Sequence, residues 1–148
     1  GIATMETYRT QPVVEHLDRQ GRKLKAGIEE AAGRRGIDAF VYPVGRACCL
    51  AYATLDRDGV PSQAFRSLLL QETIRRGILM PSLVVSYAHQ DADIDYTLEA
   101  IDGALEIYAR ALQDGVERYL VGRPSQTVYR RFNQNDQPPR PVYVRKSA

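Results

Sequence analysis

The stretch SYAHQDADID, residues 86–95, decides the fold of this chain. It joins the end of an apolar, β-rich run to the longest amphipathic pattern in the sequence, and Asp91 is a fitting N-cap between them. The apolar residues that follow at helical spacing are Ile94, Leu98, Ile101, Leu105, Tyr108, Leu112, Val116 and Tyr119. Gly122 and Pro124 are placed to end this pattern. The stretch therefore predicts the end of a strand, a turn and a long helix in immediate succession.

Two further helices are predicted nearer the N-terminus. The first has Pro12 in its first turn, and its apolar face consists of Val13, Leu17, Leu24 and Ile28. Met5 and Tyr8 are spaced to extend the same face backwards, and glycines 33 and 36 end the helix. The second helix begins near Pro61 and Ser62 and stops at Gly77, a good residue to follow a helix C-terminus.

Four short segments of the chain are expected to be extended. Residues 39–44 and 47–55 are β-rich and flank Gly45, and Pro43 indicates that the first of them is an edge strand or ends early. Residues 78–81 and 83–87 are two more apolar segments. Strands and helices in this order predict an α+β fold, in which helices cover a small, mostly antiparallel sheet and a long C-terminal helix leads into an extended tail.

No internal repeat divides the chain, so residues 1–124 are predicted to form one domain and residues 125–148 an Arg- and Pro-rich tail. The aromatic residues of this tail are Tyr129, Phe132 and Tyr143. Arginines mixed with aromatic residues are typical of nucleic-acid-binding segments. The rest of the chain nearly balances the tail's positive charge, however, so a strap held on the acidic surface of its own domain or of a partner is the preferred interpretation.

Composition excludes several classes of protein. The net charge of +2 is too small to recruit nucleic acid or a membrane by its field alone. No apolar run approaches the roughly 18 residues of a membrane helix, and no signal peptide opens the chain. Cys48 and Cys49 are adjacent, which suits neither a disulfide nor a metal site, so they are predicted to be two buried thiols of a cytoplasmic protein. The opening Gly-Ile-Ala-Thr indicates a processed chain or a piece of a longer one.

The histidines and acidic residues have structural explanations. His16 lies on the polar side of the first predicted helix and is expected at the surface, while His89 is expected to hydrogen-bond the turn before the last helix. A Ser-His-Asp triad drawn from Ser86, His89 and Asp91 would be too close in sequence for the usual geometry. The acidic residues Asp91, Asp93, Asp95 and Glu99 stabilise a helix start through the helix dipole, so no metal site is predicted.

Two linked elements carry a resemblance to a known family. Residues 75–81, RRGILMP, resemble the "ERG-hydrophobic-P" element of class III aminotransferases. Residues 86–95 match the family pattern S-x-A-H-T-x-x-D-I-D, which opens the last helix and fixes a strand end, a cap and a helix start together. Residues 1–8, 16–24 and 36–53 also resemble segments of these enzymes. The resemblance covers about residues 1–120 and extends to glutamate-1-semialdehyde 2,1-aminomutases, to which the chain is similar.

The resemblance implies a C-terminal small domain of a fold type I enzyme that is usually a homodimer. In this family a lysine of the large domain holds pyridoxal 5′-phosphate as a Schiff base, and that domain would lie upstream of Gly1. The lysines here, Lys23, Lys25 and Lys146, lie in a charged helical run or two residues from the end, which does not suit this role. No catalytic, cofactor-binding or metal-binding residue is therefore expected in this chain, which by itself would bind no cofactor and be inactive.

Four residues are candidates for the edge of the substrate cleft: Pro81, Ser82, Ser86 and His89. Ser82 is preferred over His89 for direct contact with substrate. The segment between Pro81 and Ser86 is shorter than in the aminomutases and lacks their acidic residue, which favours another small amino or keto compound as substrate. The alternative interpretation is a stand-alone binding or oligomerisation module without catalysis, and a nucleic-acid strap formed by the tail is a third and weaker one.

Overall fold

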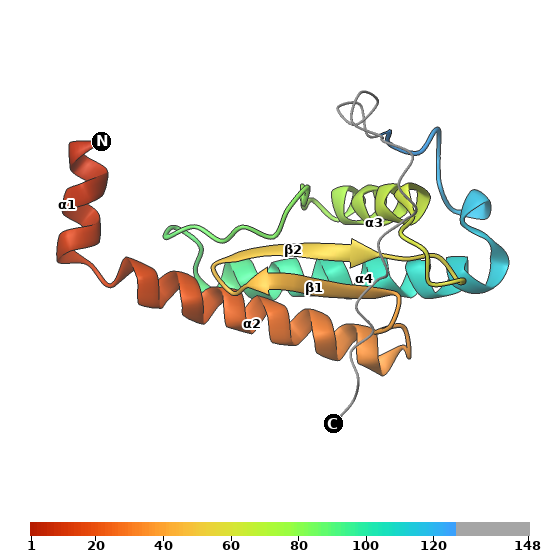
Figure 1. Ribbon diagram of the computed structural model, residues 1–148, viewed down its shortest axis with the longest axis horizontal. Helices are drawn as coiled ribbons and strands as arrows, with labels where there is room; N and C mark the ends of the chain where they lie inside the picture. The colour runs from red at the N-terminus through yellow and green to blue at the C-terminus, as the bar shows by residue number, and fades with distance from the viewer. Residues whose placement is uncertain (127–148) are drawn as a thin grey trace, which may run out of the picture.

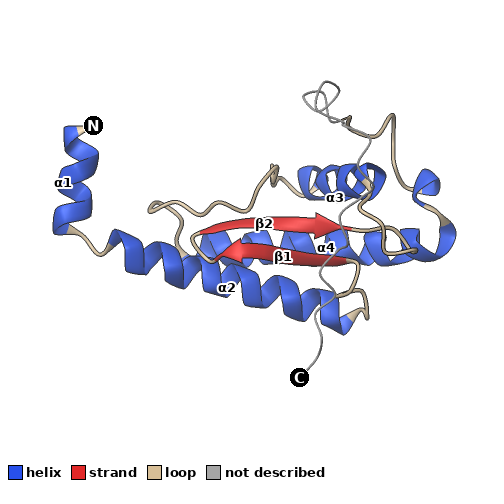
Figure 2. Ribbon diagram, viewed as in Figure 1, coloured by secondary structure: helices blue, strands red, loops and turns tan. Residues whose placement is uncertain are grey.

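The computed structural model describes residues 1–126, and these residues adopt an α+β fold, as the sequence predicted. The elements in chain order are α1 (Ile2–Thr10), α2 (Val13–Arg34), β1 (Val41–Arg46), β2 (Cys49–Thr54), α3 (Gln63–Arg75), α4 (Asp91–Asp114) and the 3-10 helix η1 (Val116–Arg118). Figure 2 shows the strands in red, with the long helices α2 and α4 running beside and behind them. None of the helices within residues 1–126 is long and apolar enough to cross a lipid bilayer.

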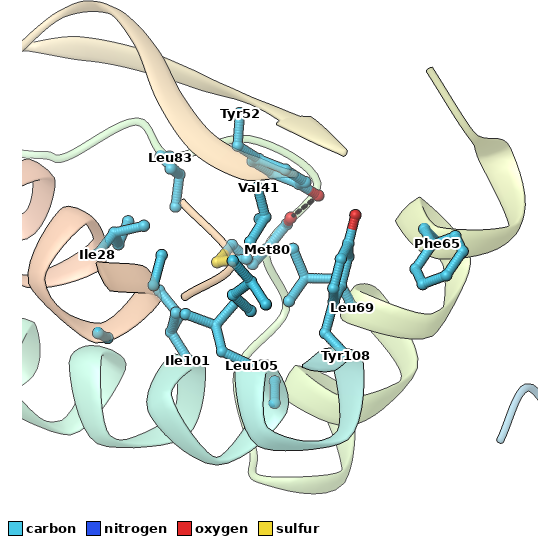
Figure 3. Packing of buried hydrophobic residues seen from close by; sticks show 14 of the residues in the cluster. Ile28, Val41, Tyr52, Phe65, Leu69, Met80, Leu83, Ile101, Leu105 and Tyr108 are labelled. Atoms are coloured by element: carbon cyan, nitrogen blue, oxygen red, sulfur yellow. Dashed lines mark hydrogen bonds between the residues drawn. The ribbon is translucent and has the colours of Figure 1, made fainter. Parts of the chain in front are cut away.

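The sheet is a β-hairpin in which β1 pairs antiparallel with β2, from Val41 opposite Thr54 to Arg46 opposite Cys49. Buried side chains from the hairpin, α2, α3 and α4 form one apolar core (Figure 3). Val41 and Leu50 belong to it from the strands. Ile101 and Leu105 enter it from α4 (Figure 3). The hairpin therefore supplies one layer and the long helices supply the layer that covers it.

The predicted extended segments 78–81 and 83–87 are not strands, which corrects the larger sheet expected from the sequence. Leu83 forms an isolated bridge with Leu50, whose carbonyl accepts the Leu83 N–H at 3.1 Å. Pro81 has no N–H to donate, and the carbonyl of Met80 accepts the hydroxyl of Tyr52 at 2.9 Å (Figure 3). The Tyr52 side chain thus supplies the hydrogen bond to the Met80 carbonyl that a neighbouring strand would otherwise supply. The edge position predicted for Pro43 is confirmed, since it lies in β1 of this hairpin.

The single N-terminal helix expected from the apolar spacing is two helices, broken at Gln11 and Pro12. A residue before proline disfavours the helical region, and Gln11 is extended at φ −124° and ψ 150°. Met5 and Tyr8 are therefore not buried with the apolar face of α2, and none of the residues of α1 is buried. Figure 1 shows α1 standing apart from the rest of the molecule.

The last helix also differs from its prediction at both ends. Gln90 rather than Asp91 is the N-cap, and its side chain and that of Asp93 form a reciprocal capping box. The helix ends at Asp114 because Gly115 adopts a positive φ of 96°. Val116 and Tyr119, the last members of the predicted apolar stripe, therefore lie beyond α4, and Gly122 and Pro124 do not end it.

The thiol and tail predictions have different outcomes. Cys48 is half-buried and Cys49 is exposed, because the hairpin turn at Ala47 and Cys48 carries both residues to the surface, so the prediction of buried thiols is wrong. Ser125, at the start of the predicted tail, docks on α3 by donating its N–H to the Ser67 hydroxyl at 2.8 Å. The predictions for Tyr129, Phe132 and Tyr143 fall outside the described residues.

An arginine cluster at the end of α2 ties that helix to α4 and predicts a pH effect. Arg35 donates to both carboxylate oxygens of Asp102, at 2.7 Å to Oδ2, and Arg34 donates to Oδ1 at 2.9 Å. The hydrogen bond from Arg35 holds the pKa of the Asp102 carboxyl below its usual range. The resulting stabilisation is complete above the unfolded-state pKa of about 3.9 and is lost as the pH falls through the lower folded-state value.

Asp102→Asn should therefore flatten the acid limb of the stability curve. We expect its free energy of unfolding to fall less than that of the wild type between pH 5 and about 2.5, by less than about 1 kcal/mol because the pair is partly exposed. Urea unfolding at a series of pH values measures this difference. Arg35→Ala removes the other partner and should flatten the curve in the same way; equal slopes for all three proteins would contradict the assignment.

Candidate functional site

The candidate site is built on the connecting segment, residues 76–90, which runs from the end of α3 to the start of α4. Leu83 and Val85 are buried in this segment, whereas Ser82, Val84 and Ser86 are exposed. An extended chain directs successive side chains to opposite sides, so the two apolar anchors hold the segment on the core and leave the alternate residues outside. With Leu83 and Val85 held in the core, the predicted site residues Ser82 and Ser86 remain exposed to solvent.

The N-terminal part of the segment is fixed by α3 and β2. Arg66 of α3 donates to the carbonyl of Pro81 at 2.8 Å, and its guanidinium lies 4.6 Å from the centre of the Tyr52 ring. The Tyr52 hydroxyl in turn donates to the carbonyl of Met80. These contacts join side chains of α3 and β2 to backbone carbonyls of the segment, and no sequence motif predicts them. They place Pro81 at an exposed bend just before Ser82.

The C-terminal part of the segment is fixed by two histidines. The Nδ1 atom of His89 accepts the backbone N–H of Ser86 at 3.0 Å, so the hydrogen bond to the turn expected for His89 is present. The Nε2 atom of His16 donates to the carbonyl of His89 at 2.8 Å, and the His16 ring meets the ring of Tyr87 edge-on at 5.1 Å. His16 is half-buried, so its predicted place on the open surface is wrong. Because a backbone N–H only donates and a carbonyl only accepts, each neutral ring carries its proton on Nε2.

The start of α4 is held by Gln20 of α2, a residue that was not among the predicted site residues. Gln20 is fully buried in α2, and its amide donates to the Asp91 carboxylate at 2.9 Å. This hydrogen bond lowers the pKa of Asp91 below its usual value. A signal was available, because Gln20 stands in the helical register of Val13, Leu17 and Leu24 and so occupies a core-facing position. The polar residue on the buried face marks the contact between α2 and the start of α4.

The predicted residues fall into two adjoining hollows that share Val85. The smaller hollow, which we call the α4 pocket, has a volume of about 190 Å³, and both Ser82 and His89 line it. The larger is an open groove of about 450 Å³ between α1, the start of α2 and the segment, and Ser86 lines that one. Pro81 lines neither of these two hollows. Ser82 and His89 thus line the same hollow, whereas Ser86 lines the other one while its backbone N–H binds the His89 ring.

The described residues do not by themselves fit a pyridoxal phosphate site. Lys23 forms an ion pair with Asp95 at 2.6 Å and donates to the carbonyl of Asp91, so its side-chain nitrogen is already engaged by two partners of the same fold. Lys25 lies two residues further along the same helix, half-buried. Among residues 1–126 no group of three or more His, Cys, Asp or Glu side chains is placed to hold a metal ion. What the segment offers is a binding and orienting surface made of hydroxyl, imidazole and apolar groups.

Comparison with known proteins gives relatives of one kind. No protein-family profile matches the chain. It is similar to the glutamate-1-semialdehyde 2,1-aminomutase of Desulforudis audaxviator, with 31% identity over 114 residues that cover 70% of this chain and 26% of that protein. For the protein of the same name from Thermomicrobium roseum the identity is 32% over 124 residues, covering 74% of this chain and 28% of the relative. The chain thus spans about a quarter of the length of the curated relatives it matches.

A solved structure agrees with these relatives. The FumI protein of Sphingopyxis sp. MTA144, solved in its PLP internal aldimine form, matches with a TM-score of 0.64 and 26% sequence identity, over 76% of this chain and 27% of that one. Sequence and structure therefore support the same assignment as the elements at residues 75–81 and 86–95. The chain is a class III aminotransferase-like domain, related to pyridoxal-phosphate-dependent enzymes.

Proposed function

We propose that this chain is the C-terminal small domain of an enzyme that uses pyridoxal phosphate to transfer or shift an amino group on a small amino or keto substrate. One observation supports this most directly. The matches cover 70% and 74% of this chain but only 26% and 28% of the aminomutases, which is the relation expected between one domain and a larger catalytic protein. The α4 pocket and its segment would then form one wall of a cleft that the rest of the protein completes.

Exposed apolar residues support a missing neighbour. Ile2 and Met5 of α1 are 87% and 73% exposed, and Leu79 of the segment is 78% exposed. Large apolar side chains exposed to this extent, two of them on the same helix, fit surfaces that other protein covers. In our proposal the large cofactor-binding domain covers them and supplies the lysine that holds the cofactor. We also propose that the complete enzyme is a cytoplasmic homodimer, as expected for this family.

The proposed work of this domain is to bind and orient the substrate. Pyridoxal phosphate, held by the large domain, would supply the electron sink needed for chemistry at the carbon that bears the amino group. Ser82 and His89 would contact the remote end of the substrate, and Val84 and Leu79 would keep water from it. The turn at residues 86–89, fixed by His16, would keep the His89 ring in place while the substrate is bound.

The position of the cofactor lysine tests the proposal. The full-length product of the reading frame that contains this chain should be incubated with pyridoxal phosphate and reduced with borohydride, and the labelled peptide should be mapped by mass spectrometry. We expect one labelled lysine per chain, upstream of Gly1, and no label at Lys23 or Lys25. Stoichiometric labelling of Lys23 or Lys25 would overturn the account of this domain, and a full-length product that takes no label would favour the stand-alone module instead.

A further inference from the structure

The α4 pocket combines a few polar groups with an otherwise apolar lining. Its polar side chains are those of Ser82, His89, Asp93 and Thr97. Its apolar lining includes Leu24, Ile78, Leu79, Met80, Leu83, Val84, Val85 and Ile94. At roughly 30 Å³ for each non-hydrogen atom, the share of one water molecule in the liquid, a volume of about 190 Å³ holds about six such atoms. The pocket is therefore large enough for the end of a small aliphatic substrate.

The charge of the lining selects against anions. Among residues 1–126, no arginine or lysine lines the α4 pocket, whereas Asp93 places a carboxylate there. Lys23 of α2 is paired with Asp95 and is not part of the lining. A carboxylate group on a ligand would have to leave water without a cationic partner and approach a like charge, which is unfavourable on both counts.

The start of α4 does not offset this charge. A helix N-terminus ordinarily attracts anions through its dipole and its free N–H groups. Here Asp91 and Asp93 already occupy the first turn, and the Gln90 side chain accepts the N–H of Asp93 in the capping box. The carboxylates of the chain itself thus offset the positive end of the helix dipole, and an anionic ligand would gain little stabilisation there.

The donors that remain suit a neutral acceptor. The Nδ1 atom of His89 is taken by the N–H of Ser86, so the proton of the neutral ring is on Nε2. The Ser82 side chain is exposed at the same pocket and can donate or accept. Two such groups at the edge of an apolar hollow match a hydroxyl, carbonyl or short alkyl end of a ligand.

We propose that the α4 pocket binds the remote end of the substrate and requires that end to be uncharged: the substrate class is an aliphatic primary amine or amino ketone, such as an amino alcohol, rather than an amino acid with a remote carboxylate. This inference rests on the proposed function for the identity of the reaction. The pocket's preference for a neutral ligand rests on the lining alone.

The first test is turnover by the full-length protein loaded with pyridoxal phosphate. The paired amines are 6-aminohexan-1-ol and 6-aminohexanoate, which have the same carbon chain and differ in the remote group. We expect kcat/KM to be at least about tenfold higher for the alcohol, which corresponds to about 1.4 kcal/mol of discrimination. Equal values, or a preference for the carboxylate, would overturn the proposal while leaving the amino-group chemistry intact.

A charge introduced into the pocket sharpens this test. Val84 lines the pocket and is 55% exposed, so Val84→Arg adds a cation without removing a core side chain. We expect this variant to raise kcat/KM for 6-aminohexanoate about tenfold and to lower the preference for the alcohol accordingly. The matched control is Val60→Arg, because Val60 is 54% exposed and lies outside both hollows. The control should keep the wild-type preference; identical behaviour of the two variants would contradict the pocket assignment.

A binding measurement separates this inference from the proposed function. The 148-residue chain labelled with ¹⁵N should be titrated with 1-butanol and with butyrate at equal concentrations, with amide shifts recorded for Ser82, His89 and Thr97. We expect 1-butanol to shift these signals and butyrate to shift them less. Larger shifts for 1-butanol, with no turnover by the full-length protein, would overturn the proposed function and leave the pocket's preference for a neutral ligand intact. Turnover by the full-length protein combined with larger shifts for butyrate than for 1-butanol would support the proposed function and overturn the neutral-ligand pocket.

Discussion

Gly21→Ala is expected to destabilise the fold more than any other alanine replacement of a glycine in the described part of α2. A Cβ atom at this position would lie 1.8 Å from the carbonyl oxygen of Ala47 and 2.3 Å from its carbonyl carbon. Both contacts are with backbone, so no side-chain rotation relieves them, and α2 must move away from the hairpin turn. Overpacking ordinarily costs about 1–3 kcal/mol, and this backbone clash should cost at least the upper value of about 3 kcal/mol.

The matched control is a replacement at Gly33, on another face of the same helix. Gly33 is also helical in α2, has open space where its Cβ would be, and has no positive φ. Gly33→Ala should raise stability by about 0.5–1 kcal/mol because alanine loses less backbone entropy in a helix. Urea unfolding followed by circular dichroism compares the two midpoints with that of the wild type. A Gly21→Ala protein with the wild-type midpoint would show that α2 does not contact the turn as described.

The second large effect concerns the hydroxyl of Tyr108. This side chain of α4 is fully buried, and its hydroxyl donates at 2.6 Å to the carbonyl of Leu55 and at 3.2 Å to that of Phe40. Phe40 immediately precedes β1 and Leu55 immediately follows β2, so one hydroxyl joins the open end of the hairpin to α4. Burial raises the pKa of Tyr108, which keeps the hydroxyl a donor through the neutral range.

Tyr108→Phe should lower the free energy of unfolding by about 1–3 kcal/mol, because it leaves a buried carbonyl without its donor while the ring remains in place. Phe40 retains the N–H of Leu55 on its carbonyl, at 2.7 Å, so the cost falls mainly on Leu55. Tyr96→Phe is the matched control, since its hydroxyl donates to the carbonyl of Arg76 from a side chain that is 52% exposed. The control should change stability by less than about 0.5 kcal/mol. Equal losses in the two variants would mean that burial does not set the cost.

Part of the candidate site could be predicted from the sequence, because its signals are local. The capping pattern and the apolar spacing after residue 90 predicted α4 to within one residue at its start. Residues 75–81 and 86–95 placed the connecting segment and directed attention to Ser82, Ser86 and His89. Which of these share a pocket could not be predicted, since that depends on which helices pack against each part of the segment.

Some contacts made by α2 could not be predicted from short-range sequence patterns. His16 and Gln20 look like polar residues of an amphipathic helix, yet they bond to residues 73 and 71 positions later in the chain. Nothing within one helical turn of either residue predicts such a partner. The exposed apolar face of α1 is a similar case, because the spacing of Met5 and Tyr8 gave no indication that Pro12 would turn them away from the core.

The sequence by itself determined the α+β class and the order of the main helices, and its stretches at residues 75–81 and 86–95 carried the resemblance to the family. Caps, proline and glycine positions and helical periodicity act over a few residues, so they can be read directly from the chain. Only the tertiary structure decided that residues 78–87 remain a connecting segment instead of adding strands, and that Ser82 meets His89 in one pocket. Strand pairing and pocket formation depend on backbone groups brought together from distant parts of the sequence, and the packing of the core selects those groups.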